Sequence, residues 1–250
     1  MENTTADISN ELAARITGAA HHKNVLLIYQ KNATMPELTY CLISKILNWH
    51  KTSLTWICWD EPANMVKKRL DYFECNTNST NIIDTVSNIA NDKHTIICAP
   101  TNFSPIMRNV HKLMKNGEHI LVLDNPGKTG IQNSGTAFIN FQSTLLNNKD
   151  PNVTIITSIE SNLLDTNMQK LLSPQYDIVF HINKDTIQFK GPTEKKQITY
   201  SIKDNKLILE PLFTSNVSKI NDIFGISPEE TVTLDKIVKN QIDAHKEMLM

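Results

Sequence analysis

Glycine is scarce in this sequence, with only seven among 250 residues. Tight turns ordinarily use glycine because it adopts the left-handed backbone conformation at no steric cost. Asparagine also tolerates that conformation, and it is abundant in this chain. We therefore expect asparagine at some of the turns where glycine would normally stand.

Metal-ligand and disulfide patterns are missing as well. The four cysteines form no CxxC pair, and three of them lie inside apolar runs, which favours buried thiols over a zinc site or a disulfide framework. His21 and His22 adjoin an expected strand, but the remaining histidines are scattered, and no HExxH motif or Cys/His cluster has ligand spacing. The sequence therefore predicts no metal centre made from cysteine and histidine.

Strong net charge and long apolar runs are also absent. The formal net charge is −1 and the pI is near 6.7, so nucleic acid and anionic membranes are not expected partners. No apolar run approaches the roughly 20 residues of a membrane span, and the first 20 residues lack the apolar segment of a signal peptide. A G-x-S-x-G nucleophile motif is missing too. We predict a cytoplasmic protein without a membrane span.

Short apolar runs of strand length recur along the chain. They are apolar on both faces, as strands of a parallel sheet covered by helices must be. The runs lie at residues 24–29, 54–59, 94–99, 119–124, 153–158 and 176–182. Apolar residues at helical spacing lie mostly between them, at residues 36–50, 62–73, 104–116 and 135–148. This alternation predicts an α/β fold with a doubly wound, mostly parallel sheet and helices on both faces.

The pattern changes after Ile182. Short runs at residues 186–191, 197–202 and 206–211 predict antiparallel strands at one edge of the sheet. Residues 227–249 begin with a capping box and continue with one apolar face, which predicts an amphipathic helix that packs either on its own domain or on a partner. We divide the chain into an α/β domain with an N-terminal helix, residues 1–212, and a linker with the C-terminal helix, residues 213–250.

Residues 25–47 have the strand, turn and helix outline of a phosphate-binding loop without its chemistry. In the Walker A loop, glycines let backbone N–H groups surround phosphates, and a lysine reaches the β and γ phosphates. Here the lysine position falls on Pro36, which has no backbone N–H to donate, or on Glu37, which would repel a phosphate. Thr34 with Glu37 can serve as a capping box instead. The degenerate loop comprises Lys31, Asn32, Thr34, Pro36 and Glu37.

A second nucleotide motif is better preserved. The segment HILVLD, residues 119–124, places an acid directly after four apolar residues, as in motifs whose carboxylate holds magnesium directly or through water. Asp124 is therefore the candidate metal ligand of this chain.

The order of the segments resembles that of the RecA-like ATPases of the KaiC, GvpD and FlaH group, which are abundant in archaea. The resemblance covers roughly residues 24–210 and rests on VLLIY with its turn and helix, LTWICWDEP, NIIDTVS, HILVLD, VTIITSIES and YDIVFHI. It implies a RecA-like fold, with Asp124 as the Walker B acid. It also implies that Asp60 or Glu61 stands where such enzymes place the glutamate that orients water. The Walker A positions depart from the family.

Two functions follow from this combination. The first is a catalytically inactive RecA/KaiC-like protein, a regulatory or scaffolding subunit that contacts a protein partner or itself, with an active KaiC-like ATPase as the candidate partner and no cofactor. The alternative is a nucleotide-binding ATPase or phosphoester-handling enzyme that binds ATP and Mg²⁺ through a non-standard loop and uses Asp124, with Asp60 or Glu61. A DNA-binding recombinase is disfavoured by the near-neutral charge.

Overall fold

The computed structural model describes residues 18, 20–30, 37–41, 43–44, 52–75, 80–90, 92–114, 117–126, 135–163, 166–190, 195–203 and 206–211. Four of the five residues of the degenerate phosphate loop, Lys31, Asn32, Thr34 and Pro36, lie outside this set. The C-terminal helix predicted for residues 227–249 lies outside it as well. The capping box at Thr34 and the division of the chain at residue 212 therefore stay predictions.

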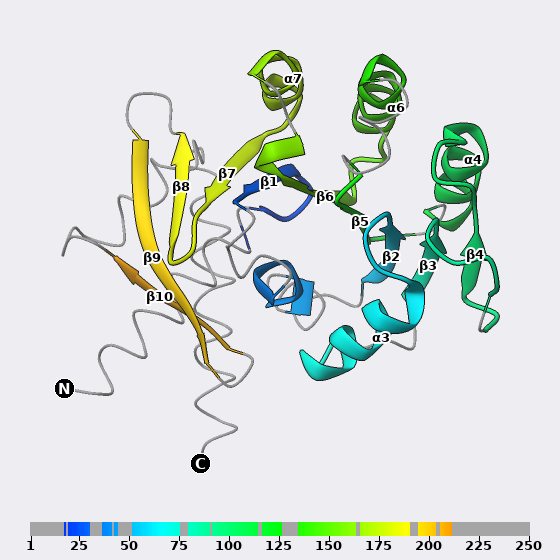
Figure 1. Cartoon of the computed structure of the whole chain (residues 1–250), viewed down its shortest axis with the longest axis horizontal. Coiled ribbons are helices and arrows are strands. Elements are labelled where there is room, and N and C mark those ends of the chain that lie inside the picture. The colour runs from blue at the N-terminus through cyan, green and yellow to red at the C-terminus, as the bar shows by residue number, and fades with distance from the viewer. Residues whose placement is uncertain are drawn as a thin grey trace.

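A ten-stranded sheet runs through the molecule in the order β10-β9-β8-β7-β1-β6-β5-β2-β3-β4 (Figure 1). Every pairing from β7 to β4 in this order is parallel, whereas β8, β9 and β10 join antiparallel at the β7 edge. The strands are β1 Asn24–Tyr29, β2 Ser53–Cys58, β3 Thr80–Asp84, β4 Thr95–Ile97, β5 His119–Asp124, β6 Val153–Glu160, β7 Ile178–Ile182, β8 Thr186–Lys190, β9 Lys195–Lys203 and β10 Lys206–Pro211. The predicted mostly parallel sheet with an antiparallel edge is confirmed.

Helices cover both faces of the sheet, as expected (Figure 1). One face carries residues 37–41 and 43–44, which are helical, together with α3 Ala63–Tyr72. The other carries α4 Phe103–Leu113, α6 Gly135–Asn147 and α7 Thr166–Leu172, with short 3-10 turns at Ser161–Leu163 and Ser173–Gln175. Strand β1 feeds both cores, because Val25 and Leu27 pack on the first face, and Leu26 and Ile28 on the second.

Two described elements were not among the predicted strands and helices. Strand β3 was missed as a strand because only Ile82 and Ile83 separate its polar residues, too short a run for a periodicity to register. Helix α7 has seven residues, fewer than two full turns, so its apolar spacing is equally weak.

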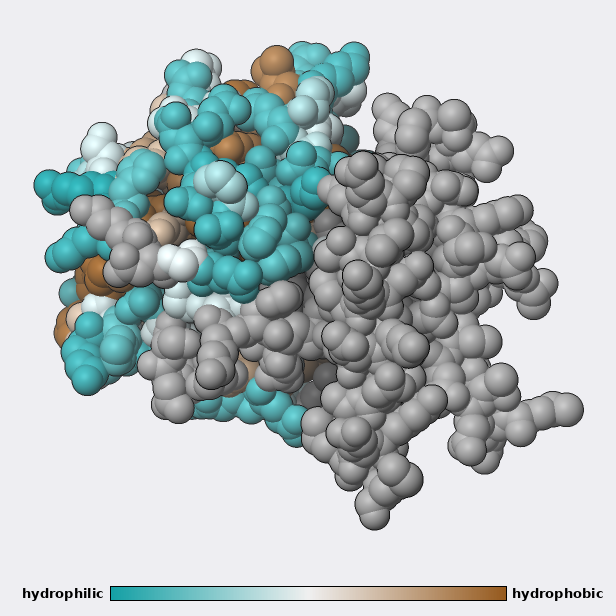
Figure 2. Space-filling view, turned by 180° about the vertical axis from the view of Figure 1, so that it is seen from behind, coloured by the Kyte–Doolittle hydropathy of each residue, from teal (hydrophilic) through white to brown (hydrophobic). Residues whose placement is uncertain are grey.

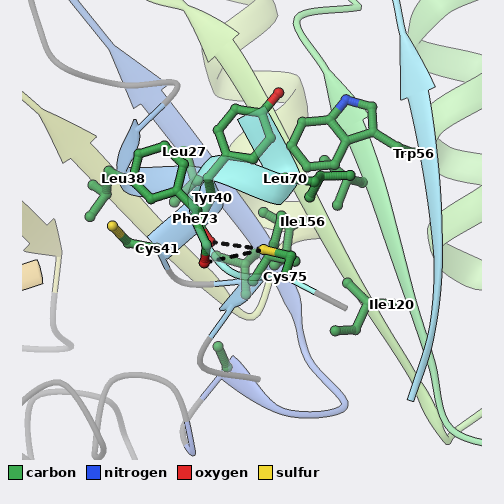
Figure 3. Packing of buried hydrophobic residues seen from close by; sticks show 14 of the residues in the cluster. Leu27, Leu38, Tyr40, Cys41, Trp56, Leu70, Phe73, Cys75, Ile120 and Ile156 are labelled. Atoms are coloured by element: carbon green, nitrogen blue, oxygen red, sulfur yellow. Dashed lines mark hydrogen bonds between the residues drawn. The ribbon is translucent and has the colours of Figure 1, made fainter. Parts of the chain in front are cut away.

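An aromatic stack locks the α3 face against the sheet. The Tyr40 ring lies 4.7 Å from that of Trp56 and 5.6 Å from that of Phe73, measured between ring centroids (Figure 3). The thiol of Cys75 donates to the carbonyl oxygens of Tyr40 and Phe73, both at 3.9 Å, and so ties the chain after α3 to the helix that contains Tyr40. All four cysteines of the chain are buried thiols, as predicted.

The topology marks one place on the sheet for a ligand. From β1 the chain proceeds to the helical residues 37–44 on one face, whereas from its neighbour β6 it proceeds to α7 on the other face. Open α/β sheets bind ligands outside the carboxyl ends of strands whose connections diverge in this way. Among the helices that the structure describes, none combines the length and hydropathy needed to cross a bilayer.

Candidate functional site

A small cavity of about 20 Å³ lies at the carboxyl ends of the central strands. Its described lining comes from the ends of β1, β2, β5 and β6, from the segment after β2, and from the helical segment that includes residues 37–41. The lining residues are Tyr29, Thr39, Tyr40, Trp56, Asp60, Glu61, Asp124 and Ser158. Space of this size holds about one water molecule.

Strand register explains why these side chains meet. The pairings place Asp84 of β3, Cys58 of β2, Asp124 of β5 and Ser158 of β6 in one row across the sheet. Residues in register on parallel neighbours point to the same face, here the face covered by α3. The row therefore presents two carboxylates and a hydroxyl beneath that helix.

Asp124 is the most perturbed acid of the site. Its Oδ1 accepts a hydrogen bond from Ser158 Oγ at 3.2 Å, and its Oδ2 accepts one from Trp56 Nε1 at 3.4 Å. Burial and the nearby Asp60 carboxylate raise the pKa of Asp124 to about 6, although the two hydrogen bonds oppose the shift. Asp124 therefore changes its charge just below neutral pH.

Asp60 is oriented by a buried asparagine at the end of β5. Asn125 donates from Nδ2 to Asp60 Oδ2 at 3.3 Å and accepts the Glu160 N–H at 3.3 Å on Oδ1. Its own backbone N–H donates to the Ser158 carbonyl at 2.9 Å. Asn125 adopts a left-handed backbone with φ of 51°, which is the use of asparagine that the scarcity of glycine predicts.

Glu61 is held from the side by α3. The Arg69 guanidinium donates to Glu61 Oε1 at 2.6 Å, and both side chains are about 30% exposed. The Arg69 guanidinium beside the cavity is therefore already paired with Glu61, one of the acids that line it.

The remaining wall is aromatic and uncharged. Burial raises the pKa of the phenols of Tyr29 and Tyr40, and the Asp124 carboxylate adds to both shifts. Burial likewise keeps Cys58, in the row with Asp124, as a thiol, because it raises the pKa of that group well above its usual value. The site thus combines acids with neutral aromatic groups, and none of its described members is a nucleophile activated by a low pKa.

Solved structures of archaeal proteins share this architecture. A KaiC-like protein of Pyrococcus horikoshii, PH0186, aligns with a TM-score of 0.53 at 14% identity, over 76% of this chain and 90% of its own. PH0321 of the same organism, an uncharacterized protein solved in complex with an unknown peptide, aligns with a TM-score of 0.54 at 12% identity, over 76% and 92%. The flagellar accessory protein FlaH of Methanocaldococcus jannaschii reaches 0.48 at 10% identity, over 77% and 86%.

The chain has the RecA-like fold of the KaiC-like proteins. By sequence alone, no protein-family model and no curated protein matches it. Identities this low establish the fold and leave the activity open.

Within the KaiC-like fold, the acids predicted from the sequence come together. Asp60, Glu61 and Asp124 line one cavity. Glu37 is helical and half-buried, and it is not among the described residues that line the cavity. Sequence reasoning missed the rest of the lining: Tyr29, Thr39, Tyr40, Trp56 and Ser158. The position of Tyr29 at the end of a predicted strand, next to the carboxyl ends of its neighbours, was the signal that could have found it.

Asp84, the acid of the NIIDTVS segment, has a structural role in this fold. Its side chain is fully buried, and its Oδ2 accepts the N–H of Ala63, the first residue of α3, at 2.8 Å. Its Oδ1 accepts the N–H groups of Val86 and Ser87 at 2.8 and 2.9 Å. Burial by itself raises the pKa of Asp84, but these donors outweigh it and hold the pKa below its usual range. Asp84 therefore fixes the start of α3 over the cavity.

Proposed function

We propose that this chain is a catalytically inactive KaiC-like protein, a cytoplasmic regulatory or scaffolding subunit that acts through protein–protein contacts. The observation that supports it best is the cavity at the carboxyl ends of the strands. That cavity has room for about one water, and its described lining offers three carboxylates and no lysine or arginine. A polyphosphate brought there would meet like charge at short range.

The sequence of the degenerate loop supports the same proposal. Pro36 and Glu37 occupy the positions where a Walker A lysine would stand, and the glycines that let backbone N–H groups approach phosphates are missing. The nearby Arg69 is paired with Glu61. The inactive subunit accordingly needs no nucleotide or metal cofactor.

Support for a protein partner comes from the surface and from a structural neighbour. Tyr72, Ile89 and Leu171 are 64%, 73% and 56% exposed and lie on separate elements. On the face shown in Figure 2, the hydrophobic residues among those described form small spots within a mostly hydrophilic surface. PH0321, which shares the fold, was solved with a bound peptide. The proposed partner is an active KaiC-like ATPase or a second copy of this chain.

Calorimetric titration of the full chain with ATP and Mg²⁺ tests the loss of activity. We expect no binding at micromolar nucleotide and no phosphate release above a protein-free blank, with an intact KaiC-like ATPase as the positive control. Micromolar binding together with turnover would refute the proposal. Light scattering after size-exclusion chromatography, with and without that ATPase, then measures self-association and complex formation.

A second function, magnesium-dependent nucleotide or phosphoester chemistry, is favoured by one observation. Three carboxylates converge in the cavity, and burial together with the Asp60 carboxylate raises the pKa of Asp124 to about 6. A bound cation would stabilise the charged form of such a group. Carboxylate oxygens are also the ligands that Mg²⁺ prefers. In this second function, Asp124 binds the Mg²⁺ ion that accompanies ATP, and Asp60 or Glu61 orients the attacking water.

The Asp124→Asn variant decides whether that second function exists. A magnesium-dependent enzyme should lose its phosphate release in Asp124→Asn and keep it in Asp185→Asn, a control at an exposed turn before β8. If the wild-type chain releases no phosphate from a panel of nucleotides and phosphoesters, the second function is excluded and the inactive subunit remains.

A further inference from the structure

Two histidines and a glutamate meet at the amino ends of the parallel strands, on the opposite side of the sheet from the acidic cavity. His21 and His22 come just before β1, and Glu118 comes just before β5. The amino ends of parallel strands lie on the same side of the sheet, so the sheet brings Glu118 next to the two histidines although it is far from them in sequence. The sequence contains no Cys/His cluster at ligand spacing, and this group has none either, because its third member is a glutamate that precedes another strand.

The side chains of the three residues converge on one another. His21 Nε2 lies 3.7 Å from Glu118 Oε2, and His22 Nε2 lies 3.8 Å from Glu118 Oε1. The ligand atoms of all three residues lie within 4.8 Å of one another, and the two imidazole rings are stacked with centroids 3.7 Å apart. A tetrahedral zinc ion with bonds of about 2.0 to 2.1 Å holds its ligand atoms roughly 3.3 Å apart. The two histidine–glutamate separations, 3.7 and 3.8 Å, are within about 0.5 Å of that spacing.

The backbone that bears the histidines is fixed by the neighbouring strand β6 and the segment before it. The His22 N–H donates to Thr154 Oγ1 at 2.7 Å, and the His22 carbonyl accepts from Lys149 Nζ at 2.6 Å. His22 itself has a left-handed backbone with φ of 61°. Lys149 also donates to the Val153 carbonyl at 2.9 Å, so its ammonium binds main-chain oxygens.

Glu118 is held in the same way from its own side. Gly117 has φ of 81°, a conformation that glycine adopts freely, and this turn delivers Glu118 to the edge of the sheet. The Glu118 carbonyl accepts the Ser53 N–H at 3.2 Å from the start of β2. Both ligand-bearing segments are therefore positioned by the sheet before any ion binds, which lowers the entropy lost on binding.

We propose that His21, His22 and Glu118 form a zinc site, with one ring nitrogen from each histidine and the Glu118 carboxylate as protein ligands. Two imidazoles and one carboxylate are a ligand set that Zn²⁺ takes with a water in the fourth position. The side chains are 17%, 34% and 37% exposed, whereas the Nε2 atoms of both histidines are themselves buried. The site joins the segment before β1 to β5. It is independent of the acidic cavity and of the function proposed there.

Zinc titration of the full, chelator-treated chain tests this site. We expect one Zn²⁺ per chain at micromolar or tighter affinity, a rise in Tm on adding zinc, and visible absorption bands of four-coordinate Co²⁺ when cobalt replaces zinc. A chain that binds no zinc at these concentrations would show that the cluster is an ion pair between protonated histidine and Glu118, and would overturn the proposal.

Three variants locate the ion. His21→Ala, the nearly isosteric Glu118→Gln, and His22→Asn, which keeps a residue tolerant of positive φ, should each weaken zinc binding by about tenfold or more. His111→Ala, an exposed histidine on α4, should bind zinc like the wild type. Equal binding by all four variants would place the ion elsewhere and overturn the assignment. Far-ultraviolet circular dichroism of the metal-free variants confirms that they remain folded.

Discussion

At the scale of single residues, Asp124 combines burial with nearby negative charge. It accepts hydrogen bonds from Trp56 and Ser158, yet its pKa stands at about 6 against an ordinary value of 3.8, because burial and Asp60 disfavour the charged form. A folded state that holds a proton more tightly than the unfolded chain loses stability as the pH rises through that interval. The acid thus weakens the fold at neutral pH, and this cost is what a functional group at a binding site typically imposes.

Asp124→Asn should stabilise the protein, and increasingly so as the pH rises from 4 to 8. The amide does not ionise, so at pH 8 the variant avoids a penalty of about 1–3 kcal/mol, whereas near pH 4 both side chains are neutral and the difference becomes small. Urea denaturation at the two pH values measures it. Asp185→Asn, on its exposed turn, is the matched control. A loss of stability in Asp124→Asn at pH 8 would contradict the raised pKa.

At the scale of elements, helix α3 depends on a strand for its start. Pro62 precedes the helix and makes no side-chain capping bond, so the N–H of Ala63 takes its acceptor from Asp84 at the end of β3. The negative carboxylate also lies favourably at the positive end of the helix dipole. This one contact links the start of α3 to the end of β3.

Asp84→Ala should destabilise the fold by about 2–4 kcal/mol. It removes the acceptor of three backbone N–H groups, those of Ala63, Val86 and Ser87, and a buried N–H without an acceptor costs about 1–3 kcal/mol. Thermal or urea unfolding measures the change. Asp92→Ala removes an exposed carboxylate that pairs with Lys67 and accepts one backbone N–H, that of His94, and the Thr95 hydroxyl, so it should cost less than Asp84→Ala. Equal losses in the two variants would show that Asp84 is no more than a surface acid.

The degenerate phosphate loop gives a second prediction at this scale. Changing Pro36→Gly and Glu37→Lys together should leave ATP binding too weak for micromolar titration, because the other glycines of a phosphate loop are still missing. Calorimetry with ATP and Mg²⁺ measures it, with the wild-type chain as reference. Tight binding restored by these two changes would show that the loop keeps its phosphate-binding geometry.

At the scale of the whole molecule, one sheet positions two separate groups of side chains, one at each end of its parallel strands. Its carboxyl edge gathers Asp60, Glu61 and Asp124 around the cavity, and its amino edge gathers His21, His22 and Glu118. The antiparallel strands β8, β9 and β10 extend the sheet beyond β7. The C-terminal segment predicted as a helix lies outside the described residues, so its role is tested on the whole chain.

Deleting residues 226–250 should leave Tm nearly unchanged while reducing oligomer size or partner capture, if the helix predicted for residues 227–249 is an interaction element. Calorimetry and light scattering measure the two properties on the same samples. A helix that completes the core would instead bury several aliphatic side chains worth roughly 1.5–3 kcal/mol each, so the truncated chain would melt early or aggregate. That second outcome would exclude the interaction role.

The sequence determined the strands and helices that lie deepest in the fold. Strands β1 and β5 begin and end where their apolar runs do, because a strand buried on both faces must be apolar throughout. Short, closely spaced runs predicted the antiparallel edge, and Asp124 lies at the carboxyl end of β5. Strand β3 was not predicted because its two isoleucines form no local periodicity, and the strand is stabilised by pairing with β2 and β4.

Only the tertiary structure decided which distant side chains meet. Strand order and register set Ser158 beside Asp124 and brought Glu118 to His21 and His22, and neither order nor register is encoded in local spacing. The surrounding donors decided the chemistry in the same way, since Asp124 and Asp84 are both buried acids at strand ends and their pKa values move in opposite directions. The physical reason is that a carboxylate is stabilised by the donors around it, and those donors come from elsewhere in the chain.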